Sequence, residues 1–274
     1  MQALWKEVFG DSGSYIQRIF RHWADAEFTL CRRNERGETV AMLCARQFAF
    51  TGGRKGLYLH GLATRPDHRG QGLMTQLIDA VRDKALAASL DFLFLIPASE
   101  SLRQWYSTFG FKNAAERAYL PLPEGALEAL CEEVFRPISP AEFNEFDRRQ
   151  PPCGLIHSLE DAEAVLDEWT EAGGTICGNV LSSDKDVFVL SDDTAKQLAD
   201  RYLSLPAASG LLNDAVATTL TTKRLCLYPS QIPLFPAGCI ERVPYGMTLP
   251  LKASVSPEKI SFSLMTVSYT HLRA

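Results

Sequence analysis

An arginine and two glycines stand close together in the segment Arg69-Gly70-Gln71-Gly72-Leu73-Met74. The segment follows an apolar stretch, 57–63, and precedes a stretch, 74–85, whose apolar side chains recur at helical spacing. Glycines let the backbone approach a ligand closely and turn its N–H groups towards it, and the start of a helix attracts anions. Since arginine adds a fork of donors suited to phosphate, the segment predicts a binding site for a phosphorylated cofactor.

Two other phosphate-binding motifs fit this segment less well. A Walker loop needs the pattern Gly-x4-Gly-Lys-Ser/Thr, which does not occur in the chain. The dinucleotide fingerprint needs a third glycine at the position of Thr75. It also needs an acidic residue about 20 positions further on, but the candidate, Asp91, begins the next predicted strand instead of ending it. The sequence therefore favours neither a nucleoside triphosphate nor a nicotinamide cofactor.

The segment resembles the R/Q-x-x-G-x-G/A pyrophosphate loop of the GCN5-related N-acetyltransferases (GNAT), with Met74 where that family usually has a small residue. Downstream, that family's Tyr-x-x-x-Gly-Phe segment resembles the run Trp105-Tyr106-Ser107-Thr108-Phe109-Gly110-Phe111. The two motifs occur in the family's order, with a helix and the predicted strand 91–96 between them. The resemblance implies an α/β fold with a mixed sheet and splayed central strands. It also implies an N-acetyltransferase that moves an acetyl group from acetyl-CoA to a primary amine, with no metal.

The resemblance assigns roles to particular residues. The loop from Arg69 to Met74 would hold the pyrophosphate, and the backbone of Leu62, Ala63 and Thr64 would pair with the pantetheine arm. The N–H of Leu62 would face the oxyanion. Ser99 would touch the same arm, or act only as the N-cap of the following helix.

Tyr106 is the implied general acid. A phenol with an ordinary pKa of ~10 is protonated at neutral pH and is able to deliver a proton to the departing thiolate. The alternative interpretation is an aromatic side chain packed in the core beside Trp105 and Phe109.

The general base is less well defined. His60 lies on the predicted strand 57–63 and is a candidate base, although a lone histidine on a strand is more often structural. Glu38, Glu100 or a chain of water molecules are alternatives. Because no cysteine has a partner that would make it a nucleophile, we expect direct transfer without a covalent enzyme intermediate.

The composition is that of a soluble globular protein: 274 residues, 46% hydrophobic and 22% charged, with a net charge of −5. This charge argues against nucleic acid and against a polybasic membrane patch, and it suits a small-molecule or peptide amine as acceptor. The 7 cysteines are scattered without a Cys-x-x-Cys pair, which predicts reduced thiols and a cytoplasmic location. Aminoglycosides, polyamines, amino acids and protein N-termini remain open as acceptors, and the oligomeric state is undefined.

The length predicts two domains. The first, 1–135, is predicted to be GNAT-like, to bind acetyl-CoA, and to lack the strand that usually opens the family's fold. The second, 136–265, resembles the degenerate second half of longer two-half acetyltransferases, on the segments 3–12, 244–247 and 262–265; a sterol-carrier-like domain is the alternative. The tail, 266–274, resembles a translated sequencing adaptor and is predicted to have no evolved role.

Periodicity and turn residues predict the individual elements. We expect helices over 2–9, 14–23, 100–109, 124–133 and 194–205, and a helix that begins after Ser158. We expect strands over 27–32, 39–50, 57–63, 91–96, 111–120 and 225–228, and a hairpin over 175–190.

Two hypotheses without catalysis stand beside the enzyme. In one, the chain is an acyl-CoA-binding regulatory module. In the other it is a structural adaptor, in which the bulky Met74 obstructs the loop.

Overall fold

The computed structural model describes residues 1–122, 136–151, 153–204, 223–256 and 260, without the side chains of 201–204. It divides the chain into two compact units, here called unit 1 and unit 2. The described residues of unit 1 lie in Met1–Ala114 and Tyr245–Ile260, and those of unit 2 lie in Ala115–Pro244. The predicted boundary at residue 135 and the predicted tail fall outside the described residues. The segment 245–260, predicted to belong to the second domain, is instead part of unit 1.

Unit 1 is built on a mixed sheet, which confirms the predicted fold class. Its strand order is β1-β2-β3-β4-β11. The neighbouring strands β1/β2, β2/β3 and β4/β11 are antiparallel, and β3/β4 is parallel. The strands are β1 (Leu30–Arg33), β2 (Thr39–Phe50), β3 (Arg54–Thr64), β4 (Phe92–Leu95) and β11 (Glu241–Pro250), which starts in unit 2. β1 begins later than predicted because the N–H groups of Phe28 and Thr29 both bond the carbonyl of Asp25, which forms a turn.

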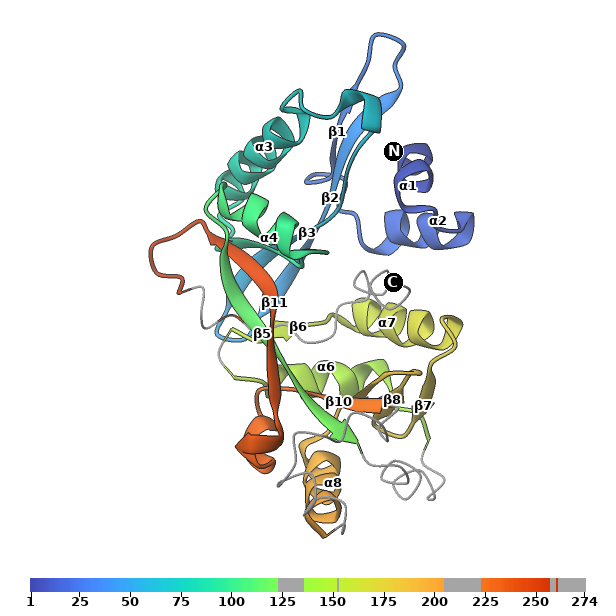
Figure 1. The fold of residues 1–274 in the computed structure, drawn as a ribbon, viewed down its shortest axis with the longest axis vertical. Coiled ribbons are helices and arrows are strands. Elements are labelled where there is room, and N and C mark those ends of the chain that lie inside the picture. The colour runs from blue at the N-terminus through green and yellow to red at the C-terminus, as the bar shows by residue number, and fades with distance from the viewer. Residues whose placement is uncertain (123–135, 152, 205–222, 257–259, 261–274) are drawn as a thin grey trace. The chain divides into compact units, whose positions relative to one another are not determined.

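Helices cover both faces of this sheet (Figure 1). On one face lie α3 (Leu73–Ala87) and α4 (Glu100–Ser107), and on the other lie α1 (Gln2–Phe9) and α2 (Gly13–His22). The apolar stripe predicted for α3 is buried at Leu77, Ile78, Val81 and Ala85 and half-buried at Met74. This stripe packs on alternate residues of β2 and β3, including Leu43 and Leu57. The apolar residues of one helix face and of one sheet face thus form a single core.

Strand β3 contains a bulge. Met42 of β2 pairs with Ala63 and Cys44 pairs with His60, so the single residue Leu43 faces both Gly61 and Leu62. Gly61 has a φ of +57°, and a Cβ there would lie 2.2 Å from Cζ3 of Trp5. Only glycine fits this position without strain and overlap.

Unit 2 has its own hydrophobic core. Its strand order is β5-β10-β9-β8-β7. The strands are β5 (Lys112–Leu122), which starts in unit 1, β7 (Thr175–Cys177), β8 (Val180–Ser182), β9 (Asp186–Val189) and β10 (Lys223–Leu227). The helices are α6 (Pro140–Arg148), α7 (Leu159–Glu171) and α8 (Asp192–Ser204), and β6 (Leu155–Ile156) is a short strand. One core cluster joins β5, β8, β9 and β10 to α8.

Two predictions in unit 2 need comment. The helix after Ser158 is confirmed, since Ser158 and Asp161 form a reciprocal capping box. The predicted hairpin over 175–190 is instead a three-stranded meander, because the chain turns early, at Gly178 with a φ of +56°. The predicted helix 124–133 lies outside the described residues.

Short 3₁₀ helices occupy Pro66–His68, Ile232–Leu234 and Ala237–Cys239. No helix in the described part of the chain is long and apolar enough to cross a membrane.

Candidate active site

The glycine loop joins the end of β3 to the start of α3. Gly70 and Gly72 both adopt the left-handed conformation, with φ of +74° and +70°, and Gly72 is the N-cap of α3. Among the described residues, no heavy atom lies within 4 Å of where a Cβ would stand at either glycine. The first N–H groups of a helix have no partner within it and carry the positive end of its dipole. The loop therefore presents an open backbone surface suited to an anion, and its binding of a pyrophosphate stays a prediction.

Two arginines flank this loop and differ in their partners. Arg65 bonds the carboxylates of Asp67 at 3.0 Å and Glu38 at 3.4 Å. Arg69 instead donates from Nε to the neutral carbonyl oxygen of Thr64 at 3.2 Å. The exposed Arg69 is thus held against the end of β3 by a neutral acceptor, which suits it better than Arg65 to meet a phosphate.

Met74, the residue that departs from the family pattern, lies in the first turn of α3. Its side chain is half-buried and packs with Leu73 against the core of unit 1. Side chains in a helix point back and down onto the neighbouring face. The bulky thioether therefore fills the interface between helix and sheet instead of the glycine loop, which counts against the adaptor hypothesis.

Strand β3 extends beyond the part of it that pairs with its parallel neighbour, β4. The β3–β4 ladder joins Gly56–Tyr58 to Phe92–Phe94, whereas β3 continues to Thr64. Leu62, Ala63 and Thr64 lie on this extension, just after the bulge, with Ala63 buried and the other two half-buried. A bulge takes one residue out of the regular ladder, and the contacts of this backbone with a ligand stay a prediction.

Tyr106 lies on α4 and is buried, with 7% of its surface exposed. Its ring lies 5.0 Å from that of Trp105, as the packing interpretation predicts, and 5.9 Å from that of Phe111. The predicted neighbour Phe109 instead has its ring 4.8 Å from that of Trp105. Burial raises the pKa of Tyr106 to about 12, which keeps the phenol protonated at neutral pH. Both interpretations of Tyr106 are compatible with this environment.

Ser99 is the N-cap of α4, as predicted. Its Oγ accepts a hydrogen bond from the N–H of Leu102 at 3.2 Å and lies 2.9 Å from Oγ of Ser101. The side chain is exposed. Its contact with a cofactor stays a prediction.

His60 is buried on the face of the sheet that α1 and α2 cover. Its Nε2 donates to the carbonyl of Trp23 at 2.6 Å, and its ring stacks on Tyr58 at 5.3 Å. Burial lowers the pKa of His60 to about 4, so the imidazole is neutral at pH 7. These contacts favour a structural histidine, and the base role stays a prediction.

The other candidate bases are both exposed and paired. Glu38 accepts from Asn34 and Arg65. Glu100 lies 3.3 Å from Arg103, one turn along α4.

The sequence pattern alone does not single out Gly61, although its bulge shapes the proposed oxyanion site. The available signal is an isolated glycine inside a strand pattern, which often marks a bulge.

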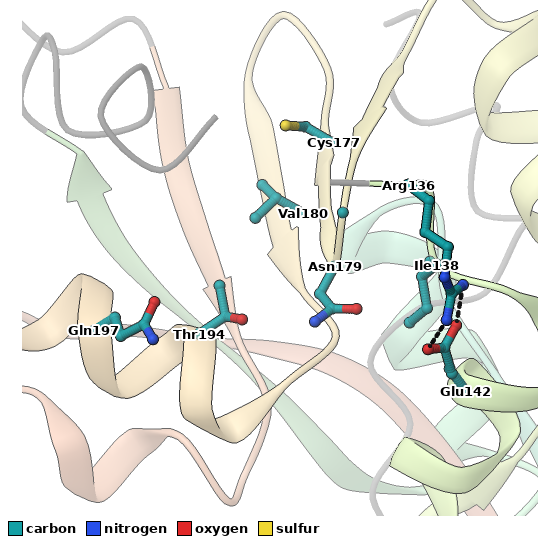
Figure 2. Close-up of a pocket in the computed structure, with 9 residues that line it drawn as sticks. Arg136, Ile138, Glu142, Cys177, Asn179, Val180, Thr194 and Gln197 are labelled. Atoms are coloured by element: carbon teal, nitrogen blue, oxygen red, sulfur yellow. Dashed lines mark hydrogen bonds and ion pairs between the residues drawn. The ribbon is translucent and has the colours of Figure 1, made fainter. Parts of the chain in front are cut away.

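A separate hollow of about 200 Å³ lies within unit 2. Figure 2 shows Asn179, Thr194 and Gln197 around it, with Arg136 and Glu142 joined to each other at one side. The Arg136–Glu142 pair is bidentate, with distances of 2.8 and 2.6 Å. The charged groups drawn there neutralise each other, so among the described residues this hollow presents no unpaired cation for a phosphorylated ligand.

Comparison with known proteins agrees with this geometry. The sequence profile of the Acetyltransferase (GNAT) family matches residues 1–111, which include the glycine loop and Tyr106. These residues form a GNAT acetyltransferase domain. This match supports acyl transfer as the general chemistry of the domain. No curated protein sequence matches the chain.

The GNAT fold likeness extends beyond residue 111. A GCN5-related N-acetyltransferase from Kribbella flavida has a TM-score of 0.59 and 18% identity, over 92% of this chain and 69% of that one. Eis1 from Mycobacterium abscessus has a TM-score of 0.57 and 12% identity, over 90% of this chain and 70% of the other. A GCN5-related N-acetyltransferase from Anabaena variabilis ATCC 29413 has a TM-score of 0.57 and 12% identity, over 90% of this chain and 68% of that one. At these identities the likeness shows a shared fold, and it confirms the predicted α/β class.

Proposed function

We propose that this chain is an N-acetyltransferase that moves the acetyl group of acetyl-CoA directly to a primary amine. The observation that carries the proposal is the course of β3. The strand leaves its ladder with β4 at Tyr58, bulges at Gly61 and Leu62, and runs through the glycine loop into α3. One continuous segment thereby offers, beyond Tyr58, a strand edge that no described strand pairs on the β4 side, for an extended arm, and an anion site for a pyrophosphate.

In the proposed reaction the amine attacks the thioester carbonyl of acetyl-CoA. The N–H of Leu62 stabilises the oxyanion that forms, because a fixed donor in a partly buried site interacts more strongly than water does. Collapse of the tetrahedral intermediate breaks the C–S bond, and Tyr106 gives its proton to the sulfur. Holding both reactants on one rigid sheet supplies much of the rate through orientation.

The attacking amine must lose a proton during the reaction. We propose that a water molecule takes this proton. His60 is a poor alternative, because its pKa is lowered to about 4 and its Nε2 donates to the carbonyl of Trp23. Small-molecule and peptide amines both remain candidate acceptors.

Thermal unfolding with and without acetyl-CoA tests the proposal, with NADH and ATP as controls. A ligand at about 100 times its Kd stabilises the native state by ~2.7 kcal/mol. For a chain of this size that raises Tm by roughly 5–10 °C. A Gly72→Val variant should lose most of this shift, whereas Gly52→Val, in a turn with a φ of +78°, should keep it. No shift with folded wild-type protein would refute the proposal.

Turnover distinguishes the enzyme from a regulatory module that only binds acyl-CoA. We expect thiol release from acetyl-CoA in the presence of a panel of amines. A thermal shift without thiol release from any amine would favour the module.

A further inference from the structure

Strand β11, more than 100 residues after β4 in the chain, pairs with β4 in unit 1. It pairs antiparallel with β4, from Met247 opposite Leu95 to Pro250 opposite Phe92. The matched GNAT profile ends at residue 111, so this strand lies outside it. The edge of β4 that faces away from β3 is therefore covered by a segment that the family match does not include.

A polar cluster fixes the chain just after β11. The carboxylate of Asp91, which is 6% exposed, accepts from Nζ of Lys252 at 2.9 Å and from the N–H of Lys55 at 2.8 Å. Arg54 bonds Asp91 at 3.3 Å and also the hydroxyl and carbonyl of Ser254. The N–H of Leu251 bonds the carbonyl of Asp91 at 2.9 Å. These bonds set the register of β11 against β4.

That register places two apolar side chains beneath the end of α4. Met247, 2% exposed, belongs to the same core cluster as Tyr106 and Phe111. Leu249 packs against this cluster, and its Cδ1 lies 3.2 Å from where a Cβ of Gly110 would stand. Gly110 ends the turn after α4 with a φ of +91° and immediately precedes Phe111, whose ring contacts Tyr106. Leu249 thus supports the turn that connects Tyr106 to its aromatic neighbour.

We propose that Leu249 of β11 is a positioning residue for Tyr106. It acts by holding the Gly110 turn, and with it the end of α4, against the sheet. The inference rests on the proposed acetyl transfer and extends it, because it makes the distal strand part of the catalytic machinery. A proton donor needs accurate placement, and a misplacement of 1 Å is able to cost a factor of about a hundred in rate.

The test is the activity of Leu249→Ala with acetyl-CoA and any amine found to react. We expect kcat to fall about tenfold or more, with the KM for acetyl-CoA changed less than about twofold, since the glycine loop and β3 are untouched. Leu249→Met should restore most of kcat. Leu30→Ala is the matched control, because Leu30 is a half-buried leucine packed on the same core from β1, at the opposite end of the strand order of unit 1. We expect its kcat to stay within about twofold of wild type.

A double-mutant cycle with Tyr106→Phe decides whether Leu249 acts through Tyr106. If it does, Leu249→Ala lowers kcat by less than about twofold in the Tyr106→Phe background, because the proton donor is already gone. Full multiplication of the two losses, or equal behaviour of Leu249→Ala and Leu30→Ala, overturns the inference and leaves acetyl transfer intact. Wild-type protein that binds acetyl-CoA but acetylates no amine refutes the proposed function, and with it this inference.

Discussion

Replacing Gly61 by alanine tests the bulge on which the proposed oxyanion site depends. The φ of +57° is one that an L-residue adopts at a cost of about 1–2 kcal/mol. The new methyl group would also lie 2.2 Å from Cζ3 of Trp5, a ring that is 2% exposed and whose Nε1 is tied to Asp11 at 2.8 Å. Overpacking of this kind costs about 1–3 kcal/mol. The expected loss in the free energy of unfolding is therefore about 2–5 kcal/mol.

Urea denaturation of matched variants measures this loss. Gly52→Ala is the control, because Gly52 has a similar φ of +78° but no described heavy atom within 4 Å of its Cβ position. It should lose only the backbone part, about 1–2 kcal/mol. We also expect Gly61→Ala to lower kcat, since the N–H of Leu62 follows directly in the chain.

The Trp5→Leu background separates overlap from backbone strain. There, Gly61→Ala should cost about as much as Gly52→Ala, because the ring is absent. Equal losses for Gly61→Ala and Gly52→Ala in the otherwise unchanged protein would refute the described packing of Trp5 on the bulge.

Three further predictions concern groups with altered proton affinity. Tyr106→Phe should lower kcat by about a hundredfold or more while the Kd for acetyl-CoA, measured by calorimetry, stays unchanged; an unchanged kcat removes Tyr106 as the acid. The pKa of His60 is lowered from 6.5 to about 4 in the folded protein. Between these pH values the unfolded state binds a proton at His60 and the folded state does not, so stability should fall as the pH drops from about 6.5 to about 4. His60→Gln should flatten that part of the plot of stability against pH. Burial opposes the charge of Asp91, but bonds from Lys252, Lys55 and Arg54 outweigh it and hold its pKa below 3.8. The contribution of the Asp91 carboxylate to stability is therefore present above pH 3.8 and lost at lower pH. Lys252→Met should lower the free energy of unfolding in urea by about 1–3 kcal/mol at pH 7, and by less at pH 3.

Much of the active-site segment could be predicted from the sequence because its determinants are local. The glycine pair must turn where Gly70 and Gly72 stand, and the stripe of α3 follows from 3.6-residue periodicity alone. Ser99 and Ser158 cap helices through N–H groups three residues away. In each of these cases the interacting groups are close in the chain, so their types and spacing suffice.

The placement of β11 could not be predicted in this way. The stretch 229–250 contains several prolines, and the sequence predicts no strand in it. Its end nevertheless becomes a strand, because β4 offers an edge and Asp91 a buried acceptor for Lys252. The burial of His60 is of the same kind. Its sequence position permits a base, and the contacts of Trp5, Trp23 and Tyr58 make it a neutral core residue.

The sequence by itself determined the glycine loop, the order of the strands and helices around it, and the resemblance to the acetyltransferases. The tertiary structure alone decided which distant segment borders β4, which face of β3 buries His60, and what supports Tyr106. Strand pairing and burial bring together residues that are far apart in the chain, and the free energy of those contacts depends on register and packing that no local pattern encodes.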